Sequence, residues 1–469
     1  MIEQGESGWP IPRSERPWSG LPVFFASAST AIATWCFFIG GQVADYLNAT
    51  AGTLTIICGS LLGILPVILA CLPPCGKYGV DSVVTSKAQL GTRGSIFAIA
   101  LIYVSVVGWN VLLMISFSRA GAEILIATGS APRSARTLLE TAMSLIGAAV
   151  VWYALRKGAD SLRSATTFMA PGVIMLGLVV LGLLIQRIGW HEIAAAEPVA
   201  ARPDPRYNYA TSVELLVSSN LSWWPYAGAI IRLSPSVRAT LWPAVFGLGL
   251  SVGLVSLIGL YTGLAVPGSG GDPTRHLLAL GGLWVALAGL AFIVLANVAT
   301  IVVGSYVAAL ALSQVPPLNR AHWNVSTLAA IIPAVIASAF FAVPSAEHFR
   351  TFLAFCGVLF GPMAGIQIAD YYLLRGRRLD IAAAFDNSRH SAYYFWNGIN
   401  PVGFAALAAG FAGYFYLLNP LTYTSHPPYD YITAAIPAAL LSAALYTLGV
   451  TLILRPSGKG GYHRQGKSR

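Results

Sequence analysis

The stretch that decides the fold is residues 357–380, GVLFGPMAGIQIADYYLLRGRRLD. Its apolar run leads into Tyr371 and Tyr372, and the arginine-rich turn 375–378 follows. Tyrosines gather at membrane–water interfaces, and basic residues gather on the cytoplasmic side of a membrane. Small residues between 361 and 365 leave one side smooth, so that another helix can approach closely. The stretch predicts a membrane-spanning helix that ends in tyrosines and emerges on a basic, cytoplasmic face.

The composition extends this prediction to the whole chain. Hydrophobic residues make up 56% of the 469 residues and charged residues only 10%, with a mean hydropathy of +0.68. A soluble protein has about 25% charged residues. Residues 1–20 are polar and lack the short apolar core of a cleaved signal peptide, so none is expected. We interpret the five cysteines, which lie in or beside apolar runs, as small apolar residues within helices.

The distribution of apolar runs predicts an all-α polytopic membrane protein with 12 transmembrane helices. A spanning helix needs about 20 mostly apolar residues. The third run is long for one helix, and the eighth has a gradual start. The runs lie near residues 21–47, 51–72, 95–127, 138–155, 165–187, 211–232, 240–265, 280–312, 324–344, 350–374, 400–418 and 430–454.

The basic residues predict the orientation. With both termini inside, the inner segments hold 20 of the 28 lysines and arginines and the outer segments 7, and Arg119 lies within the third helix. Such an excess marks the cytoplasmic side, so both termini are expected in the cytoplasm. The expected parts are a cytoplasmic segment 1–20, helices one to five at 21–187, an outer loop 188–210, helices six to ten at 211–374, a cytoplasmic loop 375–399, two further helices at 400–454 and a basic tail 455–469.

Two of the predicted helices have polar, small-residue centres. The first carries Ser27, Ser29, Thr30 and Thr34, with Gly40-Gly41 beyond, and the sixth carries 218-SSNLSWWP-225. Unwound backbone inside a membrane is tolerated where it lines a cavity, so interrupted helices point to a transport site. First and sixth helices correspond in a five-plus-five inverted repeat. The pattern predicts such a repeat, followed by two C-terminal helices.

Each polar residue also has a structural interpretation. Serine and threonine in membrane helices usually bond to a carbonyl of their own helix. Asn220 is the strongest single candidate for a substrate-binding residue, because an amide in hydrocarbon requires hydrogen-bond partners. Trp109, beside Gly108 in the third helix, can either stack a flat heterocycle or serve as a packing residue.

Charged residues within or near the predicted spans are expected to have structural roles. Arg119 and Glu123 lie four residues apart and are expected to pair with each other. Asp45 and Glu214 are expected near outer helix ends, in contact with solvent. No carboxylate is expected at mid-membrane, so the sequence indicates no proton-transfer residue.

Motifs along nearly the whole chain resemble the nucleobase:cation symporter-1 family. The most specific is residues 361–377, which resemble the family run G-P-x-A-G-[IV]-x-I-[AS]-D-Y-[FY]-L-x-R-x-R. Pro10–Pro17, Gly79–Ser95, Val107–Trp109 and Tyr394–Asn400 resemble further family motifs. The resemblance implies 12 helices, ten of them in the inverted repeat also seen in sodium-coupled amino-acid transporters.

The resemblance also implies a substrate site. Family substrates stack on the third-helix tryptophan, which corresponds to Trp109, and hydrogen-bond at the sixth-helix break. Leu113 replaces a glutamine of the hydantoin carrier, which disfavours hydantoin itself. The implied substrate-binding residues are Trp109, Ser219, Asn220, Ser222, Ala33 and Asn297.

The implied cation site is incomplete. Family sodium sites use carbonyls of the first helix, near Ser29 and Ile32, with a carbonyl and two hydroxyls from the eighth. Depending on the register at Asn297, the hydroxyl positions fall at Leu295 and Ala296 or at Ala299 and Thr300. At least one hydroxyl is missing either way, so Na⁺ and H⁺ both remain open as the coupling ion. The cation-site residues that the resemblance implies are Ser29, Ile32, Ala296 and Thr300.

We therefore expect a secondary active importer of a nucleobase or related flat nitrogenous ring, in a plasma or bacterial inner membrane. The alternatives are another cargo, such as an allantoin- or hydantoin-type ring, a thiamine precursor, an amino acid or an amine. An enzyme is not expected, because the sequence has no HExxH motif and no paired intramembrane aspartates. The expected partners are the heterocycle and the lipid bilayer, with no cofactor and no nucleic acid, in a monomer or weak oligomer.

Overall fold

The computed structural model describes residues 9–156, 169–266, 268–315, 318, 322–340 and 346–462. In these residues the chain is mostly helical and forms no named strand. Its β-type pairing there is limited to the isolated bridges Trp396–Ile399 and Leu418–Ser425. The prediction of an all-α protein is confirmed.

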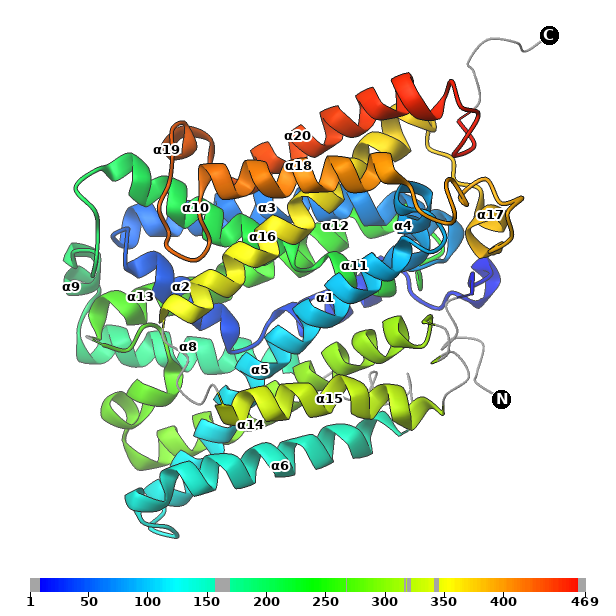
Figure 1. Ribbon diagram of the computed structural model, residues 1–469. Helices are drawn as coiled ribbons and strands as arrows, with labels where there is room; N and C mark the ends of the chain where they lie inside the picture. The colour runs from blue at the N-terminus through cyan, green and yellow to red at the C-terminus, as the bar shows by residue number, and fades with distance from the viewer. Residues whose placement is uncertain are drawn as a thin grey trace.

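Helices follow one another with short connections (Figure 1). The first half contains η1 (Arg13–Glu15), α1 (Gly20–Ala31), α2 (Trp35–Ala44), α3 (Ala49–Tyr78), α4 (Ser82–Leu90), α5 (Ser95–Ala127), η2 (Arg133–Ala135), α6 (Arg136–Leu155), α8 (Met169–Arg187) and α9 (Trp190–Ala195). The second half contains α10 (Pro205–Leu221), α11 (Trp224–Ile231), α12 (Val237–Ala244), η3 (Val245–Leu250), α13 (Ser251–Ala265), α14 (Pro273–Leu312), α15 (Trp323–Phe340), α16 (Ala346–Ile368), η5 (Ala369–Leu374), α17 (Ile381–Phe385), α18 (Pro401–Leu417), α19 (Tyr429–Ile432), α20 (Ala435–Gly449) and η6 (Val450–Leu454).

The observed helices match the 12 predicted spans closely. By length and hydropathy, seven described helices can cross a membrane alone, and the bent pair α1–α2 can form one more span. The shorter apolar helices 171–187, 323–339 and 401–417 and the pair α10–α11 occupy the other predicted positions. The gradual start of the eighth span has a cause, because Gly282 has non-helical dihedrals and kinks α14 there. Residues 165–168 and 341–344 of the predicted spans lie outside the described residues.

The spans lie side by side in one bundle (Figure 1). Helix α5 packs along α14, α2 along α13, and α3 along α10. Helices α18 and α20 pack on α16 at one side of the bundle, while α6 and α15 lie at the opposite side (Figure 1). This arrangement places the middle of α5 and α14 beside the two interrupted helices.

The small residues of the 357–380 stretch allow α16 to approach α20 closely. A Cβ atom on Gly361 would lie 3.0 Å from the Ala435 carbonyl oxygen, and one on Gly365 only 2.1 Å from that of Ala439. The latter distance is shorter than real Cβ contacts allow. The predicted close helix approach on this side is confirmed.

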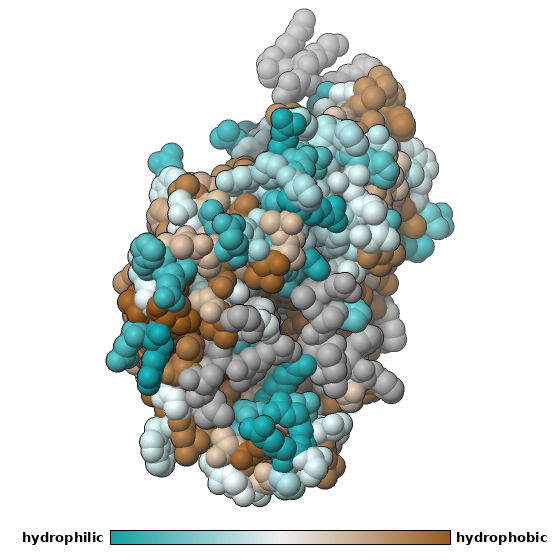
Figure 2. Space-filling view, turned by 90° about the vertical axis from the view of Figure 1, so that its left-hand side faces the viewer, coloured by the Kyte–Doolittle hydropathy of each residue, from teal (hydrophilic) through white to brown (hydrophobic). Residues whose placement is uncertain are grey.

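Apolar side chains cover the flanks of the bundle. Leu54, Leu138 and Val104, on three different helices, are among the strongly exposed ones. Figure 2 views the end of the bundle that carries α9, where hydrophilic side chains gather over much of the face and hydrophobic ones lie toward its edges. Exposed apolar flanks and polar ends are what a bilayer-embedded helical bundle requires.

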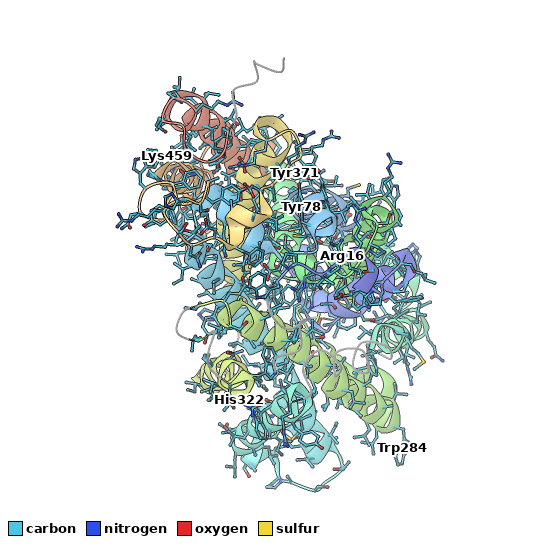
Figure 3. All side chains as sticks on the ribbon, turned by 90° about the vertical axis from the view of Figure 1, so that its right-hand side faces the viewer. Arg16, Tyr78, Trp284, His322, Tyr371 and Lys459 are labelled. Carbon is cyan, nitrogen blue, oxygen red and sulfur yellow. The ribbon has the colours of Figure 1, made fainter. Side chains whose placement is uncertain are left out.

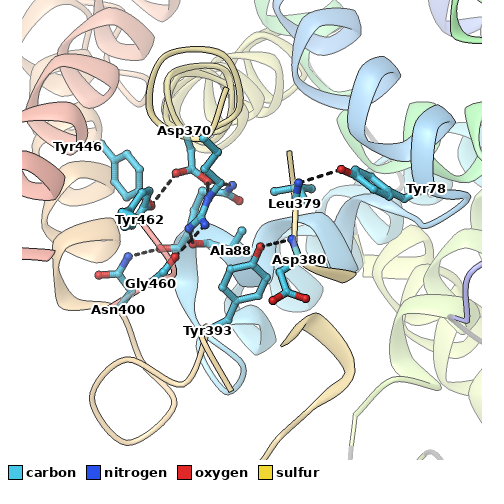
Figure 4. A network of polar contacts seen from close by, with 12 residues as sticks. Tyr78, Ala88, Asp370, Leu379, Asp380, Tyr393, Asn400, Tyr446, Gly460 and Tyr462 are labelled. Atoms are coloured by element: carbon cyan, nitrogen blue, oxygen red, sulfur yellow. Dashed lines mark hydrogen bonds and ion pairs between the residues drawn. The ribbon is translucent and has the colours of Figure 1, made fainter. Parts of the chain in front are cut away.

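At the opposite end, Asp370 is the centre of a buried polar network (Figure 4). Its carboxylate accepts hydrogen bonds from Gln89 (2.6 Å), the Arg375 guanidinium (2.7 Å) and the Tyr462 hydroxyl (2.6 Å). Arg375 also donates to the carbonyl oxygens of Ala88 and Gly460. The network thereby ties the end of α16–η5 to α4 and to the chain beyond η6.

The N-terminal segment is tied to the same end. Arg16 donates to the carbonyl oxygens of Ile11 (2.8 Å) and of Gly76 in α3 (2.7 Å). In Figure 3, which faces this end, Arg16 lies among the helices near Tyr78, whereas Trp284 lies at the edge of the molecule. Burial lowers the pKa of Arg16, which lies outside the spanning helices. Both described chain ends therefore pack against one end of the bundle.

Two expectations about charged residues are wrong. Glu214 is 2% exposed and lies within the helix bundle, not in solvent. Glu123 pairs with Arg136, and Arg119 has an ion pair with Asp272 at 3.9 Å. The sequence spacing allowed an Arg119–Glu123 pair within α5, but connections between helices bring other partners nearer. Asp45 is partly exposed and lies 3.8 Å from Arg350.

Candidate functional site

The first spanning helix is broken between α1 and α2. The two parts are bent by 65°, and Ile32, Ala33 and Thr34 connect them. Ile32 has extended backbone dihedrals, which end α1. The Thr34 hydroxyl donates to the Asn297 side-chain oxygen of α14 at 2.6 Å and so holds the break against the eighth span. The predicted interruption of the first helix is confirmed.

The sixth span is interrupted at Ser222 and Trp223, between α10 and α11. Pro225 lies in the first turn of α11, where its missing N–H costs no helical hydrogen bond. The Ser222 hydroxyl donates to the carbonyl oxygen of Ser219, one turn earlier. The serine-rich sequence thus satisfies part of the backbone at the end of α10.

A small cavity of about 20 Å³ lies between the two breaks. It also reaches the middle of α5 and α14. Four of its eight lining side chains are aromatic, and three others are hydroxyl-bearing. The lining residues are Thr30, Trp35, Trp109, Leu113, Ser222, Trp223, Tyr226 and Thr300.

The aromatic rings of the cavity contact one another in a chain. The ring centroids of Trp35 and Trp109 are 4.9 Å apart, with planes tilted by 57°. Those of Trp35 and Trp223 are 5.8 Å apart, and those of Trp223 and Tyr226 are 5.1 Å apart. Trp109 also meets Phe352 of α16 edge-to-face at 5.0 Å. The faces and edges of these aromatic rings favour a flat, conjugated ligand.

Several buried polar atoms on the helices around the cavity have no hydrogen-bond partner among the described residues. They include the indole N–H of Trp223 and the side-chain oxygen of Asn110. A Cβ on Gly304 would lie 2.6 Å from that Asn110 oxygen and 3.3 Å from the Tyr226 hydroxyl, so these two groups converge on one point of α14. The amide nitrogen of Asn297 is also unpartnered. Of the residues that carry these unpartnered atoms, only Trp223 lines the cavity, where its indole N–H is a donor for a ligand carbonyl.

The predicted site residues occupy different places. Trp109, Ser222 and Thr300 line the cavity. Ser219 and Asn220 lie in the last turn of α10, and both side chains donate to the Leu216 carbonyl oxygen. The remaining predicted residues lie at the first-helix break (Ser29, Ile32, Ala33) or on α14 (Ala296, Asn297), where the Ala296 carbonyl accepts from the Thr300 hydroxyl.

Sequence reasoning missed Trp35 and Tyr226 as cavity residues and used Trp223 only to mark the break. A signal was available, because Trp35 directly follows the first break and Trp223 lies within the second. Among the described residues, no three His, Cys, Asp or Glu side chains cluster as metal ligands.

Sequence comparison identifies the chain. Residues 10–444 match the family described as "Permease for cytosine/purines, uracil, thiamine, allantoin". This match spans nearly the whole chain. The chain belongs to the nucleobase:cation symporter-1 family. It is a transporter and not an enzyme, as predicted.

Relatives of this family transporter agree with the assignment. It is 24% identical over 428 residues to the purine-uracil permease NCS1 of Arabidopsis thaliana, covering 86% of this chain and 69% of that protein. A shorter region of 77 residues, 15% of each chain, is 36% identical to the allantoin permease of Bacillus subtilis (strain 168). A third match, over 111 residues, is 32% identical to the hydantoin permease of Microbacterium maritypicum and covers 24% of this chain and 20% of that protein.

Solved structures confirm the fold of this nucleobase:cation symporter-1 transporter. Mhp1, a nucleobase-cation-symport-1 family transporter in a closed conformation with bromovinylhydantoin bound, superposes with a TM-score of 0.80 at 17% identity over 96% of each chain. A Na⁺-coupled sialic acid symporter gives a TM-score of 0.61 at 12% identity, over 94% of this chain and 91% of that one. The predicted five-plus-five inverted repeat with two C-terminal helices is therefore confirmed.

Proposed function

We propose that this protein imports a nucleobase or related flat nitrogenous heterocycle by cation-coupled alternating access. The ring stacks on Trp109 and hydrogen-bonds at the breaks of the first and sixth helices. The observation that carries the proposal is the cavity between the two breaks, because half of its lining side chains are aromatic. The purine-uracil, allantoin and hydantoin permeases named above support the same class of cargo.

Hydrogen bonding selects an amide-bearing ring within this class. The indole N–H of Trp223 can donate to a ring carbonyl. The hydroxyl oxygens of Ser222 and Thr300, whose protons bond to helix carbonyls, can accept from a ring N–H. About two to four such bonds, each contributing about 1 kcal/mol, add to the stacking energy. The lining residues include no carboxylate, which an amine cargo would need as its counter-ion. These features support a neutral heterocycle over an amine.

The basic end of the bundle faces the cytoplasm in this proposal. Segments 1–20, 375–399 and 455–469 lie on that side, in a plasma or bacterial inner membrane. The positive-inside distribution supports this orientation. The site then opens alternately to either side as one helix group rocks against the other, in a monomer or weak oligomer.

The coupling ion is Na⁺ or H⁺. Carbonyl oxygens near Ser29 and Ile32 at the first break and the Thr300 hydroxyl are the oxygen ligands proposed for Na⁺, since hard cations prefer oxygen. Ala296, next to Asn297, has no side-chain oxygen to add. A sodium site here therefore depends on backbone oxygens and the single Thr300 hydroxyl, and H⁺ coupling is the alternative.

Thermal unfolding of the detergent-purified protein tests the proposal. The ligands are nucleobases, allantoin, hydantoins, amines and amino acids, each with and without NaCl at two pH values. A ligand at 100 times its Kd stabilises a protein by about 2.7 kcal/mol, which raises the melting temperature measurably. We expect stabilisation by a heterocycle in the wild type, reduced in Trp109→Ala and partly restored in Trp109→Phe.

Trp284→Ala is the matched control, because this tryptophan is 80% exposed on the flank of α14. It is expected to respond to heterocycles as the wild type does. Stabilisation by amino acids or amines alone would overturn the heterocycle assignment. A heterocycle response that requires NaCl identifies Na⁺ as the coupling ion, and a response that depends on pH alone identifies H⁺.

A further inference from the structure

Trp35 occupies a central place in the cavity. It is the first residue of α2, directly after the unwound residues 32–34, and it is 3% exposed. Its ring contacts both Trp109 and Trp223, at centroid distances of 4.9 and 5.8 Å. The indole of Trp35 therefore lies beside Trp109, on which a flat cargo would stack, and beside Trp223 at the sixth-helix break.

The distances leave no room for a guest ring between Trp35 and either neighbour. A flat ring between two aromatic faces needs them about 7 Å apart, because carbon atoms in contact are separated by about 3.5 Å on each side. The measured centroid distances are shorter, and the planes are tilted by 57° and 50°. A cargo ring thus shares the Trp109 face with Trp35 or displaces the Trp35 indole.

The backbone that carries Trp35 cannot retreat easily. On α2, a Cβ atom at Gly40 would lie 1.8 Å from the Ser256 carbonyl oxygen of α13, so the two backbones are in direct contact. On the other side of Trp35, Thr34 is hydrogen-bonded to Asn297. Space for a larger cargo must therefore come from the Trp35 side chain and not from movement of α2 alone.

We propose that Trp35 is a specificity-determining residue that limits the cargo to heterocycles of one ring. This inference rests on the proposed function and specifies its substrate class. In this proposal a pyrimidine or a five-membered cyclic ureide lies beside the Trp35 indole on the Trp109 face. A fused two-ring base, or a ring with a bulky substituent, meets the Trp35 indole.

Dissociation constants of the purified protein for single-ring and two-ring heterocycles test the inference. Uracil, cytosine and hydantoin represent one ring; adenine, hypoxanthine and 5-benzylhydantoin represent the larger cargo. The wild type should bind its preferred single-ring ligand more tightly than any larger one. In Trp35→Ala, the ratio of the larger ligand's Kd to the single-ring Kd should fall about tenfold, since pocket size discriminates at this level.

Trp35→Phe should shift the same ratio in the same direction by a smaller factor, and it carries the test if Trp35→Ala does not fold. Trp284→Ala should keep the wild-type ratio. An unchanged ratio in folded Trp35 variants that still bind single-ring ligands would overturn the role of Trp35 and leave the proposed function intact. If the wild type bound two-ring bases as tightly as single-ring ligands, or more tightly, the role of Trp35 would also be overturned and the proposed function would stand. A wild type that binds no heterocycle at all would overturn both proposals.

Discussion

At the scale of single residues, Glu214 shows how a carboxylate can be buried in a membrane helix. One carboxylate oxygen accepts from the hydroxyls of Ser218 (2.7 Å) and Tyr414 (2.8 Å). The other accepts from the backbone N–H groups of Ala434 and Ala435, at 2.9 and 3.0 Å. These N–H groups begin α20, where the helix dipole favours negative charge. Glu214 thus joins α10 to the last spanning helix.

Glu214→Leu should destabilise the protein by about 3 kcal/mol or more, because hydrogen bonds to a charged group contribute about 1.5–3 kcal/mol each and their buried donors would lose their acceptor. Glu214→Gln, which keeps one acceptor oxygen, should cost less. Thermal unfolding in detergent measures both. Tyr414→Phe removes a single donor to this carboxylate and should cost about 1.5–3 kcal/mol. Equal melting temperatures for the Leu variant and the wild type would contradict this role.

At the scale of elements, the contact between α16 and α20 is governed by glycine. Gly365 lets the Ala439 backbone approach within a distance that excludes any side chain. Helix association in membranes depends on such packing, because the lipid is as apolar as the side chains. The contact keeps the C-terminal helices against the tenth span.

Gly365→Ala should therefore lower the melting temperature, because overpacking a fixed contact costs about 1–3 kcal/mol. The matched control is Gly182→Ala in α8, where an added Cβ meets nothing within 4 Å. There alanine should be neutral or slightly stabilising, since its helix propensity exceeds that of glycine by about 1 kcal/mol. If both substitutions had the same effect, the close approach would not matter for stability.

At the scale of the whole molecule, the Asp370 network connects segments far apart in the chain. It joins α4, the end of the tenth span, and residues 460–462 beyond the last span. Burial raises the pKa of Tyr393, which faces the Arg375 guanidinium and lies outside the spans, so its phenol stays protonated at neutral pH. The ion pair Asp370–Arg375 is the buried centre of this end.

Removing one partner of this ion pair should be costly. Arg375→Leu leaves the Asp370 carboxylate without its cation, and breaking a buried pair typically costs about 3–5 kcal/mol. The double variant Asp370→Asn, Arg375→Leu should recover part of this loss, because no buried charge remains. Melting temperatures of the two single variants and the double variant measure the coupling. Strictly additive losses would show that the two side chains do not act as a pair.

Labelling of introduced cysteines measures the proposed orientation. Ser457→Cys and Glu197→Cys lie at exposed positions, the first beyond the last span and the second in the loop 188–210. A Cys58→Ser background removes the one exposed native cysteine among the described residues. A membrane-impermeant maleimide should label position 197 in intact cells and position 457 only in inside-out vesicles. The reverse pattern would invert the topology.

The amino-acid sequence alone determined the membrane class, the spans and the two breaks. Each depends on local hydropathy and local polar residues, which neighbouring sequence already specifies. The third span, expected at 95–127, is observed as Ser95–Ala127. The sequence also pointed to Trp109, because its place in the third helix resembles a family motif.

Only the tertiary structure decided which side chains meet. Trp35 and Trp223 are 188 residues apart in the chain, and their rings are 5.8 Å apart in the cavity. The burial of Glu214 and the ion partners of Arg119 and Glu123 likewise depend on helices that are distant in sequence. Hydropathy shows that a helix lies in the membrane but not which of its faces meets which neighbour, because packing between helices is set by the shapes of both partners.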